Sequence, residues 1–197
     1  LYWRTDALDF FSPLALLGSL DRPPPHPYLL RMRHAEDQAT LAALTRDADV
    51  MALARDPDSV RLLWEVCQVP DFQGIVTEGH TRLLSRVFRF LREPAGRIPE
   101  DFLASHVKDI DRADGDVETL LGRIAAIRTW TYISQRRSWV PDARFWQERT
   151  RAVEDRLSDA LHERLTQEFV DRPGTVIARH DPSELVTSVG GDGEVLV

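Results

Sequence analysis

The sequence predicts a mainly α-helical protein: a helical bundle with one long antiparallel helical hairpin and a candidate small β element at the C-terminal end. From residue 35 to residue 170, apolar residues recur at steps of three and four, the period of amphipathic helices. Prolines and glycines divide this stretch into helix-sized segments. The 197 residues are 43% hydrophobic and 29% charged, which is typical of a soluble, folded chain. No apolar run approaches the roughly 20 residues of a transmembrane helix.

The first 34 residues carry little helical pattern. Ser12 followed by Pro13 and four leucines predicts one short helix, because serine is a favoured N-cap and proline suits the first helical position. The prolines within residues 23–27 then predict an extended connection, and we place the main boundary of the chain there. A proline-rich ligand for an SH3-type domain is the alternative, but a stiff spacer is the favoured interpretation.

Five helices are expected between the proline run and the hairpin. Asp56 and Pro57 give the third of them a cap and a first residue, and Pro70 ends it. The residues around Pro94 and Gly96 end the fourth. The expected ranges are 35–45, 48–54, 57–68, 75–92 and 99–111.

The two longest helices follow a turn at residues 114–116. The first begins at Val117 and places apolar residues at helical spacing as far as Trp130. The second runs from about residue 142 to residue 170. The short connection at residues 138–141 makes the two helices antiparallel neighbours. The apolar stripe of the second helix is Trp146, Val153, Leu157, Leu161 and Leu165.

Beyond residue 172 the pattern changes. Residues 175–178 and 194–197 resemble short strands, and a glycine-rich turn at residues 190–193 lies between them. The chain starts without methionine and stops in an apolar run, so we expect it to be a piece of a longer protein.

Positive charge is concentrated in two segments of an otherwise acidic chain with a net charge of −7. Residues 119–151 hold seven arginines against two acidic residues, and residues 71–97 hold five against three. Arginine grips phosphates and stacks on bases. The candidate nucleic-acid-binding residues are Arg82, Arg86 and Arg89 on one helix, and Arg128, Arg136, Arg137 and Trp139 around the hairpin tip.

Two further expectations concern these side chains. Trp130 lies at core spacing, whereas Trp139 lies next to a helix break and is the more plausible exposed ring. The alternative interpretation is that the arginines form a solvated face, or pair with the acidic segments inside the bundle.

The sequence contains no motif for a self-contained active site. It has no phosphate-binding loop before a lysine, no Gly-x-Ser-x-Gly elbow and no His-Glu-x-x-His pair. We therefore expect no catalytic residue, metal ligand or cofactor site in this chain. Cys67 is the single cysteine, which excludes an internal disulfide; we expect it to be a buried apolar group.

Several stretches resemble the C-terminal region of bacterial DExH-box RNA helicases related to the mitochondrial RNA-degradosome helicase. The opening residues 3–6 (WRTD) and 8–10 (LDF) resemble the exit from that family's second motor domain. The stronger matches are residues 62–72 (LLWEVCQVPDF), 80–84 (HTRLL), 127–133 (IRTWTYI), 146–151 (WQERTR) and 154–166 (EDRLSDALHERLT).

The resemblance implies an accessory domain that guides single-stranded nucleic acid behind a RecA-like motor. The partners would be the upstream RecA-like domains and, through the parent helicase, single-stranded RNA or an RNA–DNA duplex. Residues 1–34 would then be a linker leaving the upstream motor domain, residues 35–172 the helical accessory domain, and residues 173–197 the start of a small β-containing or flexible segment. ATP and magnesium would act in the parent helicase, outside this chain. A cytoplasmic location is expected, with no membrane contact. The alternative function is a protein-docking helical scaffold that recruits a nuclease or a ribosomal partner.

Overall fold

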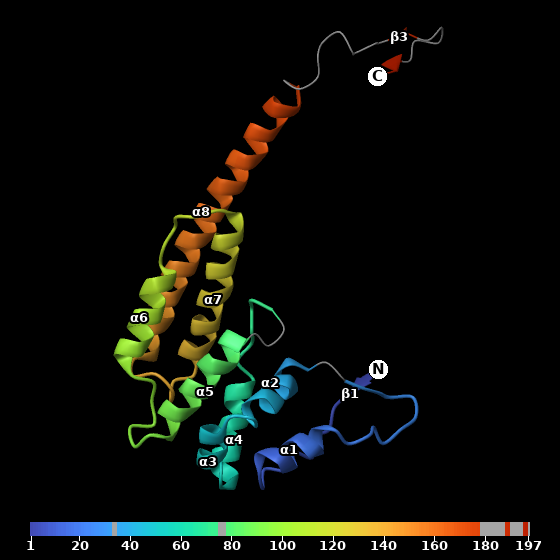
Figure 1. Ribbon diagram of the computed structural model, residues 1–197, viewed down its shortest axis with the longest axis vertical. Helices are drawn as coiled ribbons and strands as arrows, with labels where there is room; N and C mark the ends of the chain where they lie inside the picture. The colour runs from blue at the N-terminus through green and yellow to red at the C-terminus, as the bar shows by residue number, and fades with distance from the viewer. Residues whose placement is uncertain (33–34, 75–77, 178–187, 190–194, 197) are drawn as a thin grey trace.

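The computed structural model describes residues 1–32, 35–74, 78–177, 188–189 and 195–196, and in these residues the protein is mainly helical, as the sequence predicts (Figure 1). Two pairs of two-residue strands accompany the helices. The elements are β1 Tyr2–Trp3, α1 Pro13–Leu20, β2 Leu30–Arg31, α2 Glu36–Leu44, α3 Ala48–Leu53, α4 Pro57–Cys67, α5 Glu78–Arg92, α6 Glu100–Ile110, α7 Val117–Gln135, α8 Ala143–Ile177, β3 Ser188–Val189 and β4 Val195–Leu196.

Side-chain caps fix several helix starts where the sequence predicts them. Ser12 Oγ accepts the Ala15 N–H ahead of α1. Asp56 and Ser59 form a reciprocal capping box at α4, which satisfies two backbone donors that the helix leaves unpaired. Asp116 caps α7 by accepting the N–H of Thr119 at 2.8 Å.

The central feature is the antiparallel hairpin of α7 and α8, which lie side by side in Figure 1. Apolar residues of both helices are buried in one core, among them Ile127 from α7 and Val153 from α8. Trp130 is buried in this core, as predicted. Helices α2, α3, α4 and α5 form the neighbouring part of the bundle, and Leu63 and Phe88 are fully buried there. Burying such side chains stabilises the fold by roughly 1.5–3 kcal/mol each.

The N-terminal segment folds back onto the bundle. Leu16 and Leu20 of α1 belong to the same hydrophobic core as the later helices. Strand β1 pairs in parallel with β2, and the proline run lies in the connection between α1 and β2. Arg4 forms an ion pair with Asp37 of α2 at 2.7 Å. Residues 1–32 are thus attached to the helices, while the division of the chain into linker and accessory domain stays a prediction.

The C-terminal end corrects one prediction. Residues 175–177 belong to α8, so the strand expected at residues 175–178 is wrong there; residue 178 lies outside the described residues. Pro173 lacks a backbone N–H, which removes one helical hydrogen bond without requiring the helix to end. Of the strand expected at 194–197, residues 195–196 form β4, which pairs antiparallel with β3, and residues 194 and 197 lie outside the described residues. The expected turn at residues 190–193 lies outside the described residues.

Gly115 has a backbone conformation that other residues rarely adopt. Its φ is +124°, and an added Cβ would lie 2.9 Å from Thr119 Cγ2.

We expect Gly115→Ala to lower the free energy of unfolding by about 1–3 kcal/mol in urea denaturation. Gly122→Ala is the matched control. Gly122 lies inside α7 with open space around a Cβ, so alanine there is expected to raise stability by about 0.5–1 kcal/mol. Equal effects of the two variants would contradict this account of the turn.

Candidate nucleic-acid interface

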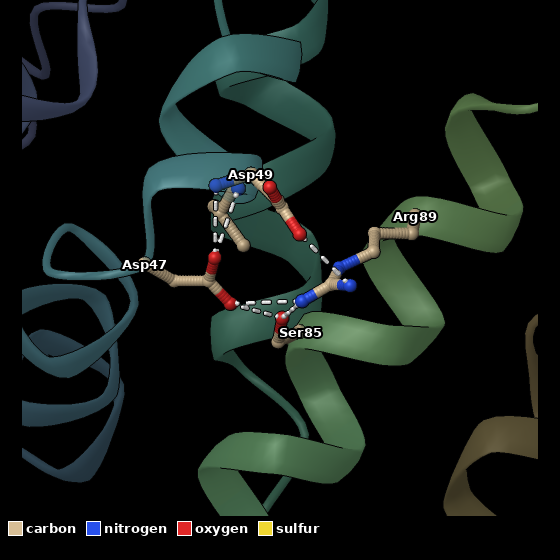
Figure 2. A network of polar contacts seen from close by, with 5 residues as sticks. Asp47, Asp49, Ser85 and Arg89 are labelled. Carbon is tan, nitrogen blue, oxygen red and sulfur yellow. Dashed lines mark hydrogen bonds and ion pairs between the residues drawn. The ribbon is translucent and has the colours of Figure 1, made fainter.

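Arg89 of α5 belongs to a partly exposed polar network that links α5 to α3 (Figure 2). Its guanidinium forms ion pairs with Asp47 at 3.2 Å and with Asp49 at 3.1 Å, and it donates to Ser85 Oγ at 3.1 Å. Ser85 in turn donates to Asp47 at 2.5 Å. The network joins α5 to the start of α3, where Asp47 is the N-cap. Arg89 therefore links α5 to α3 by ion pairs. This agrees with the alternative interpretation, in which arginines pair with acidic residues of the same bundle.

Asp47 is held as a carboxylate by this network. Burial on its own would raise the pKa of Asp47, but hydrogen bonds from Ser85 and from the N–H groups of Asp49 and Val50 outweigh it and lower the pKa below its ordinary value.

The other two candidate arginines of α5, Arg82 and Arg86, are exposed. Arg86 lies with its guanidinium carbon 4.7 Å from the ring centre of Phe102 and forms no ion pair among the described residues. Arg82 forms an ion pair with Glu78 one turn earlier. Both partners of that pair are largely exposed, so the pair contributes little and can open for a ligand. Arg82 and Arg86 are therefore available to bind an anion. Arg89 is not, because its guanidinium is paired with Asp47 and Asp49.

The candidate arginines of the hairpin also differ in whether they have partners inside the protein. Arg128 pairs with Glu154 of α8 at 2.8 Å, which ties the two helices of the hairpin together. Arg136 lies over the rings of Tyr132 and Trp139 and donates to Tyr132 Oη at 3.2 Å. Arg137 is exposed and makes no ion pair within the described ranges.

Trp139 corrects the prediction of an exposed stacking ring. Its side chain is 2% exposed and belongs to the hydrophobic core. The N–H of Trp139 donates to the carbonyl of Arg136 at 2.8 Å, so the chain turns and carries the ring into the core. An aromatic ring buries a large apolar area, and this burial outweighs the local signal of a helix break. Trp139 therefore cannot stack on a base in this conformation.

The exposed ring at the hairpin tip is Phe145, which sequence reasoning missed. Phe145 is 49% exposed and packs edge-on against the buried Trp146, with ring centres 5.2 Å apart. A sequence signal existed: Phe145 precedes Trp146 and falls outside the apolar stripe of α8.

A single backbone hydrogen bond brings the two positive segments together. The N–H of Ile98 donates to the carbonyl of Trp139 at 2.8 Å, so the loop between α5 and α6 lies against the hairpin connection. Arg97 precedes Ile98 and is exposed. We call Arg97, Arg137, Arg144 and Phe145 the hairpin-tip group. Arg144 pairs with Glu148 on the same helix, and both side chains are exposed.

His80, near the start of α5, is a buried group that can take up a proton. Its Nε2 donates to the carbonyl of Val69 at 3.1 Å and the side chain is buried. Burial lowers the pKa of His80 below 6.5, against an opposing contribution from Asp71. The unfolded chain therefore binds this proton more readily than the folded chain, so stability present above pH 6.5 is lost as the pH falls towards the folded pKa.

We expect the melting temperature to fall on acidification below pH 6.5. Replacing His80 by glutamine keeps a side-chain N–H donor and should flatten this dependence. The control is His162→Gln at an exposed position of α8. Parallel melting curves against pH for the parent and the His80 variant would refute the assignment.

Within the described ranges, no group of His, Cys, Asp and Glu side chains is arranged to hold a metal ion, and no helix is long and apolar enough to cross a membrane. Cys67 is buried, and desolvation raises the pKa of its thiol.

No family model, curated protein or solved structure matches this chain.

Proposed function

We propose that the chain is an accessory helical domain of an ATP-dependent RNA helicase, and that it guides single-stranded nucleic acid along the hairpin-tip group. The observation that carries the proposal is the hydrogen bond from Ile98 to Trp139, because it joins the two arginine-rich segments at one end of the hairpin. ATP and magnesium would act in the motor of the parent helicase.

The chemistry of the hairpin-tip group suits a single strand of any sequence. Arg97 and Arg137 can neutralise phosphates, and the half-exposed ring of Phe145 offers a face or edge to a base. The net charge of −7 opposes general binding to nucleic acid, so attraction is confined to places where arginines gather.

One observation favours a protein-docking role beside this one. Seven large apolar side chains within the first 32 residues are exposed: Leu1, Tyr2, Phe11, Leu14, Tyr28, Leu30 and Met32. Contiguous exposed apolar patches mark interaction surfaces, and these side chains are the candidates for one. The RecA-like motor of the same protein is the partner that fits the proposal, and a nuclease or ribosomal protein is the alternative.

The proposal predicts the effect of removing two guanidinium groups. We expect the double variant Arg97→Gln/Arg137→Gln to bind a fluorescent 12-mer of uridine about 10- to 100-fold more weakly than the parent chain, because each phosphate contact is a charge-assisted hydrogen bond. The measurement is fluorescence anisotropy at low salt, beside a melting curve.

The matched control is Arg46→Gln/Arg151→Gln, which removes two exposed arginines outside the hairpin-tip group. It should bind the 12-mer like the parent, apart from a small loss from net charge. If both double variants lose the same affinity, the contact is general electrostatics and the hairpin tip has no special role.

A further inference from the structure

A second candidate site lies away from the hairpin tip, in a pocket of about 340 Å³ bordered by α5, α6, α7 and the segment that follows α4. Its size falls in the range of small-ligand sites. The described residues that line it include four aromatic rings, two arginines and several polar side chains.

Aromatic rings form one wall of the pocket. The ring centres of Phe102 and His106 on α6 are 4.2 Å apart, and that of Trp130 on α7 lies 5.1 Å from His106. Trp130 is buried behind, while Phe102 and His106 are partly exposed. His106 Nδ1 donates to the carbonyl of Phe102 at 2.8 Å, which fixes the imidazole plane and leaves Nε2 as a second polar atom. A flat heterocycle is the ligand that such a wall accommodates.

Two guanidinium groups stand at the rim. Arg86 rests over Phe102, so its planar fork is pre-oriented without a carboxylate partner among the described residues. Arg82, one turn earlier, is engaged only with the exposed Glu78 in this part of the chain. Both arginines also border a second pocket of about 230 Å³ beside Ser85. Arg82 and Arg86 are thus shared by the two pockets. An anion bound by these arginines could place its attached groups in either pocket.

Polar side chains also line the pocket. The exposed Gln73 donates its amide N–H to the carbonyl of Gly122 at 3.1 Å, and its amide oxygen is an acceptor. Thr129 and Asp71 also line the pocket. Such groups match the donors and acceptors on the edge of a nucleobase.

We propose that this pocket binds one nucleoside monophosphate unit, with its base against Phe102 and His106 and its phosphate on Arg86 and Arg82. The unit is either a free mononucleotide or one residue of a single strand. In the second case the site extends the proposed function, because a strand held at the hairpin tip would also place a nucleotide here.

The test is isothermal titration of the whole chain with the four nucleoside 5′-monophosphates and with ribose 5-phosphate, which lacks a base. We expect at least one mononucleotide to bind about 5-fold or more tightly than ribose 5-phosphate, in proportion to a stacked base. Arg86→Gln should lower mononucleotide affinity about 10-fold or more. Arg151→Gln, outside both sites, should leave it unchanged.

A second variant guards against a merely structural effect. Phe102→Leu keeps an apolar side chain in place but removes the ring beneath Arg86. The readout is therefore the ratio of the two affinities, and the preference for mononucleotide over ribose 5-phosphate should fall. Failure of every mononucleotide to bind overturns the proposal. So does equal binding of ribose 5-phosphate, or of a phosphoserine peptide, because the aromatic wall would then have no role.

Competition separates the two sources of the ligand and the two proposals. A mononucleotide that displaces the uridine 12-mer assigns the pocket to a strand, and one that binds without displacing it assigns the pocket to free nucleotide. The Arg97→Gln/Arg137→Gln variant should still bind mononucleotide. If the parent chain binds a mononucleotide but not the 12-mer, the proposed function is wrong. The proposal of a nucleotide-binding pocket would still be supported.

Discussion

Leu157→Asp is expected to unfold the protein at room temperature. Leu157 is 1% exposed and lies on α8, within the core that the hairpin shares. An uncompensated buried charge costs about 3–5 kcal/mol, and loss of the leucine contacts adds about 2–5 kcal/mol. The sum approaches the whole stability of an ordinary domain, about 5–15 kcal/mol. Circular dichroism and a melting curve would measure the loss.

The control for this variant lies one residue away. Ser158 is exposed on the same helix, so Ser158→Asp changes the charge equally without burying it. We expect its free energy of unfolding to lie within about 0.5 kcal/mol of that of the parent. If Leu157→Asp also melts like the parent, the hairpin core is wrongly assigned.

Trp139→Ala is expected to lower the free energy of unfolding by about 3–5 kcal/mol, because it removes a large buried ring from the core. Arg136 would also lose one of the two rings beneath its guanidinium. The measurement is urea denaturation, with RNA affinity determined below the onset of unfolding. In that range we expect the affinity for RNA to stay close to that of the parent.

Phe145→Ala should behave in the opposite way. Its ring is half-exposed, so stability should change by about 1 kcal/mol or less. If Phe145 stacks on a base, affinity for a single strand should fall by about 1–3 kcal/mol. Reversed results for the two variants, with Trp139→Ala weakening RNA binding and leaving stability intact, would restore Trp139 as the contact ring.

The helices could be predicted because their signals are local. The cap at Asp56 and the proline after it lie within a few residues of the helix they start, and α4 begins there. The apolar stripe of α8 likewise identifies its buried residues as far as Leu157. The small β element was predicted in part, since β4 is present but pairs with β3, and residues 175–177 belong to α8.

The candidate site could be predicted less well, because the state of a surface side chain depends on distant partners. Nothing near Arg89 in the sequence indicates that Asp47, the N-cap of α3, and Asp49 of α3 will pair with it. The burial of Trp139 likewise depends on the fold of the hairpin connection, and the position of Arg97 depends on a hydrogen bond between Ile98 and a residue far along the chain. Charge counts by segment indicate where arginines are abundant, but they do not tell which of them are free.

The central claim is that this chain holds a single strand by phosphate contacts at the hairpin tip. The most direct measurement is the affinity of the parent chain and of Arg97→Gln/Arg137→Gln for the uridine 12-mer at several salt concentrations. Each phosphate contact to a single strand contributes about 0.7 to the slope of log affinity against log salt. We predict measurable binding by the parent, and a slope that is smaller by about 1.4 in the double variant. No binding by the parent at low salt, or the same slope in both proteins, would contradict the claim.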